Sequence, residues 1–246
     1  MKKGLVLLLS IVVMLAVACD GGGGGDDDDD RRGSGNIIAE ERDVSGFDRV
    51  LVTGSGIAEI IQGDTESLVV EAEDNIMPFV ESKVEDGVLV LGQKSGAILN
   101  PTEPIKYTVT MIDVVGLDIT GSGAINSDSI DTSIISVGLS GSGGINIAGL
   151  DGDSVDLSLN GSGGVWLSGD VADQVVEITG SGEYRAADLH SATAVIAIGG
   201  SGSAVVWVDT TLDVTVTGSG GISYYGDPIL TQSVTGSGEV ESLGER

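Results

Sequence analysis

The tripeptide Gly-Ser-Gly recurs at nearly constant spacing, and this repeat limits how the chain can fold more than any other feature. Its first glycine stands at positions 54, 121, 141, 161, 180, 200, 218 and 236, so copies from 121 onward are 18–20 residues apart. A fixed period of this length is typical of solenoids, in which each unit buries its apolar side only against its neighbours. We therefore expect one structural coil per repeat.

Apolar residues hold fixed places on both sides of each tripeptide. The positions two and four before the first glycine are apolar in nearly every copy, and the residues between them are polar or small. The second position after the last glycine is apolar as well. Alternation with a period of two is the pattern of a β-strand with one buried face, so each copy is predicted to be strand, glycine corner, strand. The two best-kept rows are Val52, Ile119, Leu139, Leu159, Ile178, Ile198, Val216 and Val234 before the corner, and Ile125, Ile145, Val165, Tyr184, Ala204, Ile222 and Val240 after it.

These patterns predict an all-β solenoid with coils of 18–20 residues. A meander of antiparallel hairpins is the alternative, but hairpins would not need corner glycines in one frame through so many copies. Residues 36–115 depart from the repeat, and we expect them to form a first coil and an irregular N-terminal β cap. Residues 116–246 should form the regular coils. The single cysteine excludes a disulfide framework, so the fold must be held by burial and strand pairing.

The N-terminus has the features of a lipoprotein leader. Residues 1–18 combine a basic start with an apolar stretch of signal-peptide length, and small residues precede Cys19, which is the predicted lipidation site. An ordinary secretory signal followed by an incidental thiol is the alternative. Residues 19–35 are rich in glycine and aspartate and are predicted to be a flexible tether. Asp20 resembles an inner-membrane retention signal, whereas the acidic run behind it resembles a surface-export signal.

The opening segment Ser45–Val50, the repeated Gly-Ser-Gly corners and the lipoprotein start together resemble a known family. The chain is similar to the putative auto-transporter adhesin, head GIN domain proteins, over about residues 40–240. The resemblance implies a single-stranded, right-handed parallel β-helix of the pectin-lyase-like type. It brings no catalytic residues, because the family has none established.

The charge of the chain excludes several classes of partner. It contains 11 basic and 38 acidic residues, and its formal net charge is −27. Nucleic-acid binding is not expected, because a basic surface is needed to neutralise phosphates. Docking to anionic lipid head groups is disfavoured for the same reason, which leaves the N-terminal lipid as the expected membrane contact. An acidic polysaccharide is equally unsuited as a substrate.

Catalytic and metal-binding residues are not predicted, and no cofactor is expected. Arg185 is the one arginine among the regular coils, and such a residue is usually solvated or ion-paired. His190 has no cysteine or histidine near it in sequence, so neither a triad nor a metal centre is indicated. The calcium-binding solenoid motif is missing its aspartate, although Asp151-Gly152-Asp153 could form a weak site. The remaining acids fall between strands, where turns commonly place aspartate: Asp128, Asp131, Asp156, Asp170 and Asp173.

Aromatic residues near the corners are the candidates for a binding surface. Exposed aromatic rings can stack on sugar rings or anchor a protein partner, although they can also simply cover a loop. Trp166 and Trp207 lie two coils apart, so a shared patch is not assured. The candidate surface residues are Trp166, Tyr184, Arg185, Trp207 and Tyr225.

These observations predict a cell-envelope lipoprotein with a non-catalytic, adhesin-like binding or structural β-helix. Its expected partners are the membrane, through the lipid, and a glycan or an envelope protein. The outer membrane or cell surface is favoured, and the periplasmic face of the inner membrane is the alternative because of Asp20. Two other functions stay open: a carbohydrate-active enzyme on neutral glycans, and a periplasmic partner of an envelope-stress complex.

Overall fold

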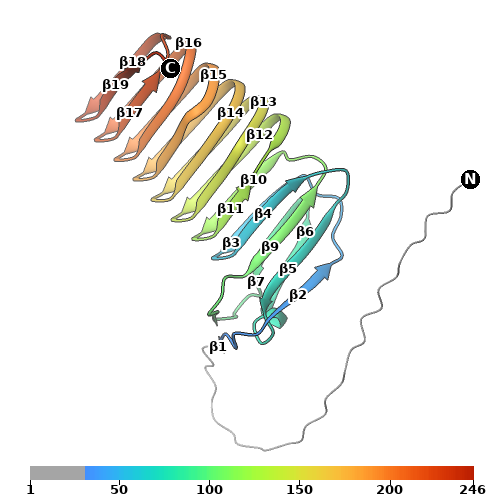
Figure 1. Cartoon of the computed structure of the whole chain (residues 1–246). Helices are drawn as coiled ribbons and strands as arrows, with labels where there is room; N and C mark the ends of the chain where they lie inside the picture. Colours follow the sequence, from blue (N-terminus) through green and yellow to red (C-terminus); the bar gives the residue numbers. More distant parts are fainter. Residues whose placement is uncertain (1–30) are drawn as a thin grey trace, which may run out of the picture.

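The computed structural model describes residues 31–246, which form strands almost throughout and one short 3-10 turn (Figure 1). The predicted signal peptide and Cys19 lie outside the described residues. The cap region contains β1 (Arg31–Arg32), β2 (Ile37–Arg42), β3 (Arg49–Gly54), β4 (Ile57–Gln62), β5 (Ser67–Glu73), η1 (Met77–Phe79), β6 (Val80–Glu85), β7 (Val88–Gln93), β8 (Leu99–Asn100) and β9 (Lys106–Met111). The regular coils contain β10 (Gly116–Gly121), β11 (Ala124–Ser127), β12 (Ile130–Gly141), β13 (Gly144–Gly161), β14 (Gly164–Gly180), β15 (Glu183–Gly200), β16 (Ser203–Gly218), β17 (Gly221–Tyr225), β18 (Ile229–Gly236) and β19 (Glu239–Gly244).

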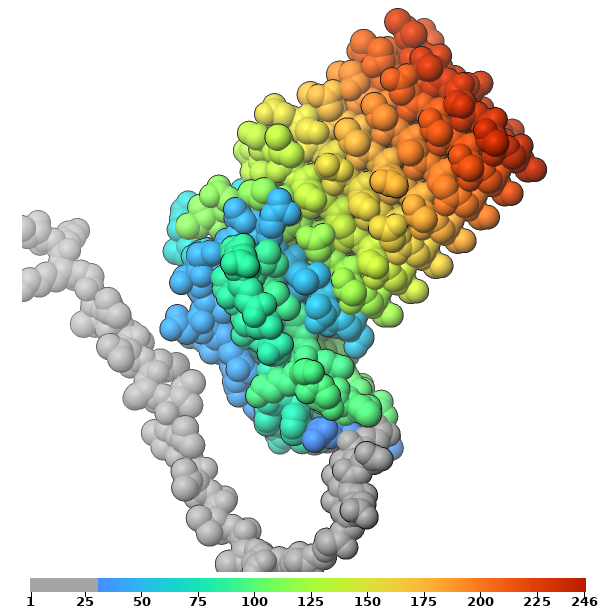
Figure 2. All heavy atoms as spheres, turned by 180° about the vertical axis from the view of Figure 1, so that it is seen from behind, coloured from blue at the N-terminus to red at the C-terminus, as the bar shows by residue number. Residues whose placement is uncertain are grey.

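The strands from β10 to β19 stack as successive coils of a β-solenoid (Figure 1). All pairings between coils are parallel, and each corner glycine lies opposite the corner glycine of the next coil, as Gly121 does with Gly141 and Gly141 with Gly161. The space-filling view shows the coils following one another in chain order from the cap to the C-terminal end (Figure 2). The predicted solenoid is confirmed, and the antiparallel meander is excluded for this region.

The corner glycines are required by both conformation and space. Gly141 and Gly161 have φ values of 130° and 131°, a region that residues with a side chain rarely adopt. A Cβ atom on Gly161 would lie 2.3 Å from the carbonyl oxygen of Gly141 in the coil below. That carbonyl oxygen accepts hydrogen bonds from the N–H groups of Ser162 (2.9 Å) and Gly163 (3.1 Å). The repeated tripeptide therefore forms a continuous hydrogen-bonded column along one edge of the solenoid.

The predicted apolar rows form the core. Each row is an in-register ladder in which one residue of every coil packs on its equivalents above and below. Burial of such ladders is the main source of stability in a fold without disulfides or long loops. One example, in the row four residues before the corner, is Leu117, Val137, Leu157, Val176, Ile196 and Val214, all 3% exposed or less.

The first coil is threaded differently from the others. The β3–β4 coil bends at Gly54 and pairs in parallel with β10 and β11 on one side, and with β7 and β9 on the other. Within residues 63–115, strands β7 and β9 pair with the side of the first coil that faces away from the regular coils. The chain then crosses to the other side of the first coil, where β10 and β11 begin the regular coils. This order places the first coil inside the stack.

Antiparallel strands close the N-terminal end, as expected for a cap. Strand β2 pairs with β5, β5 with β9, and β6 with β7, all antiparallel. The predicted hairpin turn at Asp86-Gly87 is present, with positive φ at both residues. Ile76 and Met77, at the short 3-10 turn, are buried within the core cluster. Together these elements cover the apolar end of the first coils.

The end of the predicted tether is part of the fold. The buried carboxylate of Glu73 accepts hydrogen bonds from the N–H of Gly35 (2.7 Å) and from the hydroxyl (2.5 Å) and N–H (2.9 Å) of Thr102. These bonds, with the Thr102 hydroxyl first, hold the pKa of Glu73 below its ordinary value. Strand β1 pairs with β8 close by. The assignment of residues 31–35 to the flexible tether is therefore wrong.

The C-terminal end has no comparable cover among the described residues. Val234 continues the buried row of Val216, its register partner, but is 39% exposed because no later strand packs on it. Ile229 and Leu243 are also exposed, at 74% and 40%. None of the helical structure in residues 31–246 is long and apolar enough to span a membrane.

Candidate functional site

A shallow groove on the outer surface of β13–β16 contains two of the predicted binding residues, Trp166 and Arg185. It lies on the part of each coil that follows the glycine corner, and its volume is about 390 Å³. Apolar, amide and charged side chains line it in a mixture that suits recognition. The lining residues are Asn146, Trp166, Leu167, Ser168, Arg185, Ala187, Asp188 and Val205.

The groove forms where the length of the coil changes. Strand β15 belongs to a 20-residue coil and β16 to an 18-residue coil, and the register between them shifts after Ala186, which pairs with Val206. The next pair is His190 with Trp207, so residues 187–189 of β15 have no partner in β16. A β-bulge of this kind bends the strand and redirects side chains, and here it places Asp188 at the side of the groove.

Trp166 supplies a flat apolar surface in the groove. A Cβ atom on Gly164 would lie 2.4–2.9 Å from three atoms of the six-membered ring, so the indole rests face-down on the backbone there. The ring also extends over Gly144 in the preceding coil. The residue is 38% exposed. One face of the indole therefore packs on glycine backbone while part of the side chain is available to a ligand.

Polar side chains flank this ring on both sides. Trp166 pairs in register with Asn146 of β13 and with Arg185 of β15, so the three form one outward row across neighbouring coils. The Arg185 Nε donates to Glu183 Oε1 at 2.7 Å, and the arginine side chain is 57% exposed. This ion pair raises the pKa of Arg185 and neutralises its charge locally.

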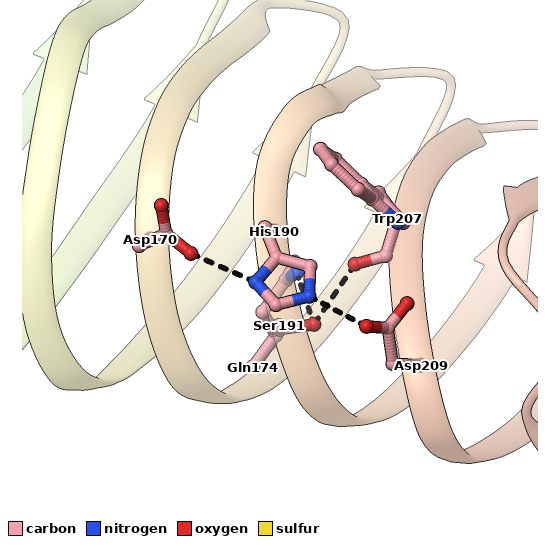
Figure 3. Close-up of polar contacts among 6 residues, drawn as sticks. All are labelled: Asp170, Gln174, His190, Ser191, Trp207 and Asp209. Carbon is pink, nitrogen blue, oxygen red and sulfur yellow. Dashed lines mark hydrogen bonds and ion pairs between the residues drawn. The ribbon is translucent and has the colours of Figure 1, made fainter. Parts of the chain in front are cut away.

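A second cluster lies beside the bulge and is centred on His190 (Figure 3). The ring Nδ1 lies 2.7 Å from Asp170 Oδ1, and Nε2 lies 2.8 Å from Asp209 Oδ2. Only the imidazolium can donate from both nitrogens, so hydrogen bonds to Asp209 and Asp170 raise the pKa of His190. The ring also meets the indole of Trp207 edge-on at 4.8 Å. The histidine thus links three successive coils.

This cluster is not a metal centre. The two carboxylates lie on opposite sides of the ring in Figure 3 and do not converge on one point. Across residues 31–246, no group of three or more histidine, cysteine, aspartate or glutamate side chains is arranged to hold a metal ion.

Tyr184 does not belong to the binding surface. Its side chain is fully buried, because it occupies the inward row that the period-two pattern assigns to the core. Its hydroxyl donates to Gln174 Oε1 at 2.8 Å, and Gln174 Nε2 donates to Ser191 Oγ at 2.9 Å. The Ser191 hydroxyl donates in turn to the carbonyl oxygen of Trp207 at 3.1 Å (Figure 3). The prediction of Tyr184 as a surface residue is therefore wrong.

Trp207 and Tyr225 lie next to each other but outside the groove. They are register partners in β16 and β17, and the guanidinium of Arg246 lies 5.5 Å from one ring centroid and 5.2 Å from the other. Arg246 also donates to the carbonyl oxygen of Ala187 and to Asp188. The C-terminal arginine therefore connects this aromatic pair to the side of the groove.

The grooves of the described residues differ in the number of carboxylates that line them. Asp118 is the single acid in a second groove of about 450 Å³, where burial raises its pKa and Arg49 lowers it to a smaller extent. Glycoside hydrolysis requires two carboxylates that face one substrate. Asp151 lines a third groove together with Asp64 and Asp131. The groove on β13–β16 contains a single carboxylate, Asp188, so it lacks such a pair.

Sequence reasoning identified Trp166 and Arg185 but missed their neighbours. Asn146 and Asp188 carry no motif, and the register shifts that place Asp188 are visible in the sequence only as changes in repeat length, from 19 to 20 and then to 18 residues. The network of Gln174 could have been suspected, since a polar residue there interrupts the row of Val155 and Ala194.

Comparisons with known proteins place the fold in a known group. The family described as "Putative auto-transporter adhesin, head GIN domain" matches residues 46–228. A putative adhesin from Bacteroides fragilis NCTC 9343 has a similar structure, with a TM-score of 0.81 and 22% identity over 86% of this chain and 99% of that chain. A putative adhesin from Parabacteroides merdae ATCC 43184 gives a TM-score of 0.70 and 22% identity, over 86% and 98% of the two chains.

A further structure of the same fold carries a different description. It is a putative lipid binding protein from Parabacteroides distasonis ATCC 8503, with a TM-score of 0.73 and 27% identity over 86% of this chain and 98% of that chain. No curated protein sequence matches the chain.

Proposed function

The chain belongs to the putative auto-transporter adhesin, head GIN domain family, and we propose that it is an adhesin-like binding module of the cell envelope that performs no chemistry itself. The observation that carries the proposal is the groove on β13–β16. It exposes Trp166 and Arg185 on a rigid sheet, and no pair of facing carboxylates accompanies them. An exposed aromatic residue next to an arginine is the composition typical of recognition surfaces.

The position of the groove supports attachment through the N-terminus. The described chain begins at Arg31, beside β8 and the cap, whereas the groove lies on coils farther along the stack (Figure 1). A lipid on Cys19, followed by the glycine- and aspartate-rich residues 20–30, would hold the capped end toward the membrane. The groove, on the side of the stack, would then lie at a distance from the membrane.

A lipid-binding role, as described for the Parabacteroides distasonis protein, has less support. The inward positions of the regular coils are filled by packed side chains, and the grooves on the described part are shallow surface features. An acyl chain would have to displace this core, at the cost of its packing. The enzyme alternative also has less support at this groove, because Asp188 is the single carboxylate that lines it.

Protease treatment of intact cells tests the proposal. We expect the wild-type protein to be cleaved on intact cells, and the Cys19→Ser variant to be released or retained inside, because the anchor is lost. Protection of the wild-type protein until the outer envelope is opened would contradict a surface adhesin. That result would favour the alternative of a periplasmic partner of an envelope complex.

A further inference from the structure

The groove on β13–β16 also indicates what kind of ligand it recognises. Resting on the proposed function, in which this groove is the binding surface, we infer that it binds a neutral pyranose saccharide whose apolar face stacks on the indole of Trp166. Three features support this inference: the two glycines under the indole of Trp166, the polar groups on each side of the indole, and the charge around it.

The first feature is the pair of glycines, Gly164 and Gly144, on which the indole of Trp166 packs. Any larger residue at position 164 would collide with the six-membered ring, since a Cβ there would come within 2.4 Å of it. Gly144, in the preceding coil, leaves a similar space, with the ring 3.2 Å from its Cβ position. The two glycines let the indole lie along the sheet instead of standing away from it. A ring fixed in this way loses little conformational entropy when a flat ligand covers it.

The second feature is the row of hydrogen-bonding groups beside the ring. Asn146 and Arg185 lie on opposite sides of Trp166, one coil away each, which corresponds to about 4.8 Å in a β-sheet. Asparagine offers both donors and an acceptor, and arginine offers five N–H donors, of which the one on Nε is engaged by Glu183. Sugar hydroxyls project around the rim of a pyranose ring. The amide and the guanidinium therefore lie where the hydroxyls of a stacked sugar would be.

The third feature is the balance of charge. Arg185 is paired with Glu183, and Arg246 with Asp188, so both cations near the groove are already neutralised. The whole chain carries a formal net charge of −27. Uronate or sulfated glycans would be repelled by this field, and the groove offers no unpaired cation to compensate. An uncharged saccharide meets no such penalty.

Fluorescence of a single tryptophan tests this inference directly, because the chain contains only Trp166 and Trp207. The processed protein carrying Trp207→Phe is purified from membranes in a detergent without a sugar head group. It is then titrated with cellohexaose, maltoheptaose, laminarihexaose, mannohexaose and chitohexaose. We expect at least one of these neutral oligosaccharides to change the emission of Trp166 saturably. A hexamer of galacturonate should cause no saturable change.

Calorimetry with matched variants then measures the contribution of the indole. Trp166→Ala should weaken binding of the same oligosaccharide by about tenfold or more, as expected when a central aromatic contact is removed. Trp207→Ala removes a tryptophan outside the groove and should leave the affinity within about twofold. Arg185→Ala should also weaken binding without changing the thermal midpoint.

Two results would overturn the inference. The first is that none of the five neutral oligosaccharides alters the Trp166 emission at millimolar concentration. The second is that Trp166→Ala and Trp207→Ala weaken binding equally. Protease shaving does not depend on the ligand, so a protein cleaved on intact cells that binds no neutral saccharide would leave the proposed function standing while this inference fails.

Discussion

At the scale of single residues, His190 is the side chain whose charge should respond most visibly to pH. Both ring nitrogens face carboxylates, so folding raises the pKa of His190 above its ordinary value of 6.5. Stabilisation by the imidazolium is therefore complete below about pH 6.5 and is lost as the pH rises through the folded-state pKa. Titration of a surface histidine thus becomes linked to the stability of three neighbouring coils.

We predict that His190→Gln lowers the free energy of unfolding by about 0.5–1 kcal/mol at pH 5.5, as for partly exposed ion pairs. The difference from wild type should shrink by pH 9. Urea unfolding of both proteins at the two pH values measures this. Contact with Trp207 is lost equally at both pH values, so only the pH-dependent part of the difference reports the ion pairs. A difference that is the same at pH 5.5 and pH 9 would contradict the prediction.

The buried network around Gln174 should also matter for stability. Removing the Tyr184 hydroxyl leaves the buried Gln174 Oε1 without its donor, and an unsatisfied buried polar atom costs about 1–2 kcal/mol. We therefore expect Tyr184→Phe to lower the urea midpoint accordingly. In the double variant Tyr184→Phe/Gln174→Leu the position joins its apolar row, and Ser191 keeps its bond to the Trp207 carbonyl oxygen. The double variant should recover most of the lost stability. An unchanged urea midpoint for Tyr184→Phe would show that the network contributes nothing to stability.

At the scale of structural elements, the corner glycines set the spacing and register of the coils. Gly161→Ala introduces a side chain at φ 131° and places a Cβ atom 2.3 Å from a backbone oxygen of the neighbouring coil. Neither group can move without breaking the hydrogen-bonded column. We expect the substitution to destabilise the protein by about 3 kcal/mol or more.

Gly199 provides the matched control for this prediction. It directly precedes the corner glycine of its coil, has an ordinary φ, and its nearest obstacle to a Cβ atom is 3.9 Å away. Gly199→Ala should change the free energy of unfolding by no more than about 0.5 kcal/mol. Comparable losses for Gly161→Ala and Gly199→Ala would show that the column is not what holds the corner. Thermal and urea midpoints of the two variants decide between these outcomes.

The elements also show where sequence reasoning succeeds and where it stops. Solenoid coils were predictable because local alternation and a recurring glycine specify both the buried face and the corner. The place of the β3–β4 coil, between β7/β9 and β10/β11, was not predictable, since pairing between distant segments leaves no local pattern. Val52 looks the same in the sequence whether its coil ends the stack or lies within it.

At the scale of the whole molecule, the candidate site was predictable only in part. Trp166 and Arg185 stand at outward positions of the period-two pattern, so their exposure followed from the sequence. Their proximity to Asp188 depends on two register shifts, one between β14 and β15 after Trp166 and one between β15 and β16 after Ala186. Such shifts arise from the mismatch between neighbouring coil lengths, not from one coil alone. Tyr184 was assigned to the surface against its own position in the pattern, and the structure follows the pattern.

The two ends of the solenoid differ in how well their core is covered, and this difference predicts where local unfolding begins. At the N-terminal end, antiparallel strands and the buried Ile76 and Met77 cover the core. At the other end, β18 and β19 lie against only one coil, and residues of the inward rows such as Val234 are exposed. In a solenoid each coil is stabilised mainly by its nearest neighbours, so a coil with one neighbour loses much of its stabilisation.

We therefore predict that amide hydrogen exchange is fastest in β18 and β19 and slowest in β12–β15, measured by mass spectrometry on the intact protein. The protected region should reach into the cap, since β5 and β7 are paired on both sides. Val234→Lys, at an exposed place in the last coil, should leave exchange in β12–β15 unchanged, whereas Leu159→Ala should increase it there because Leu159 is fully buried. Uniform protection from β10 to β19 would contradict this account and would indicate that another chain covers the C-terminal coil in solution.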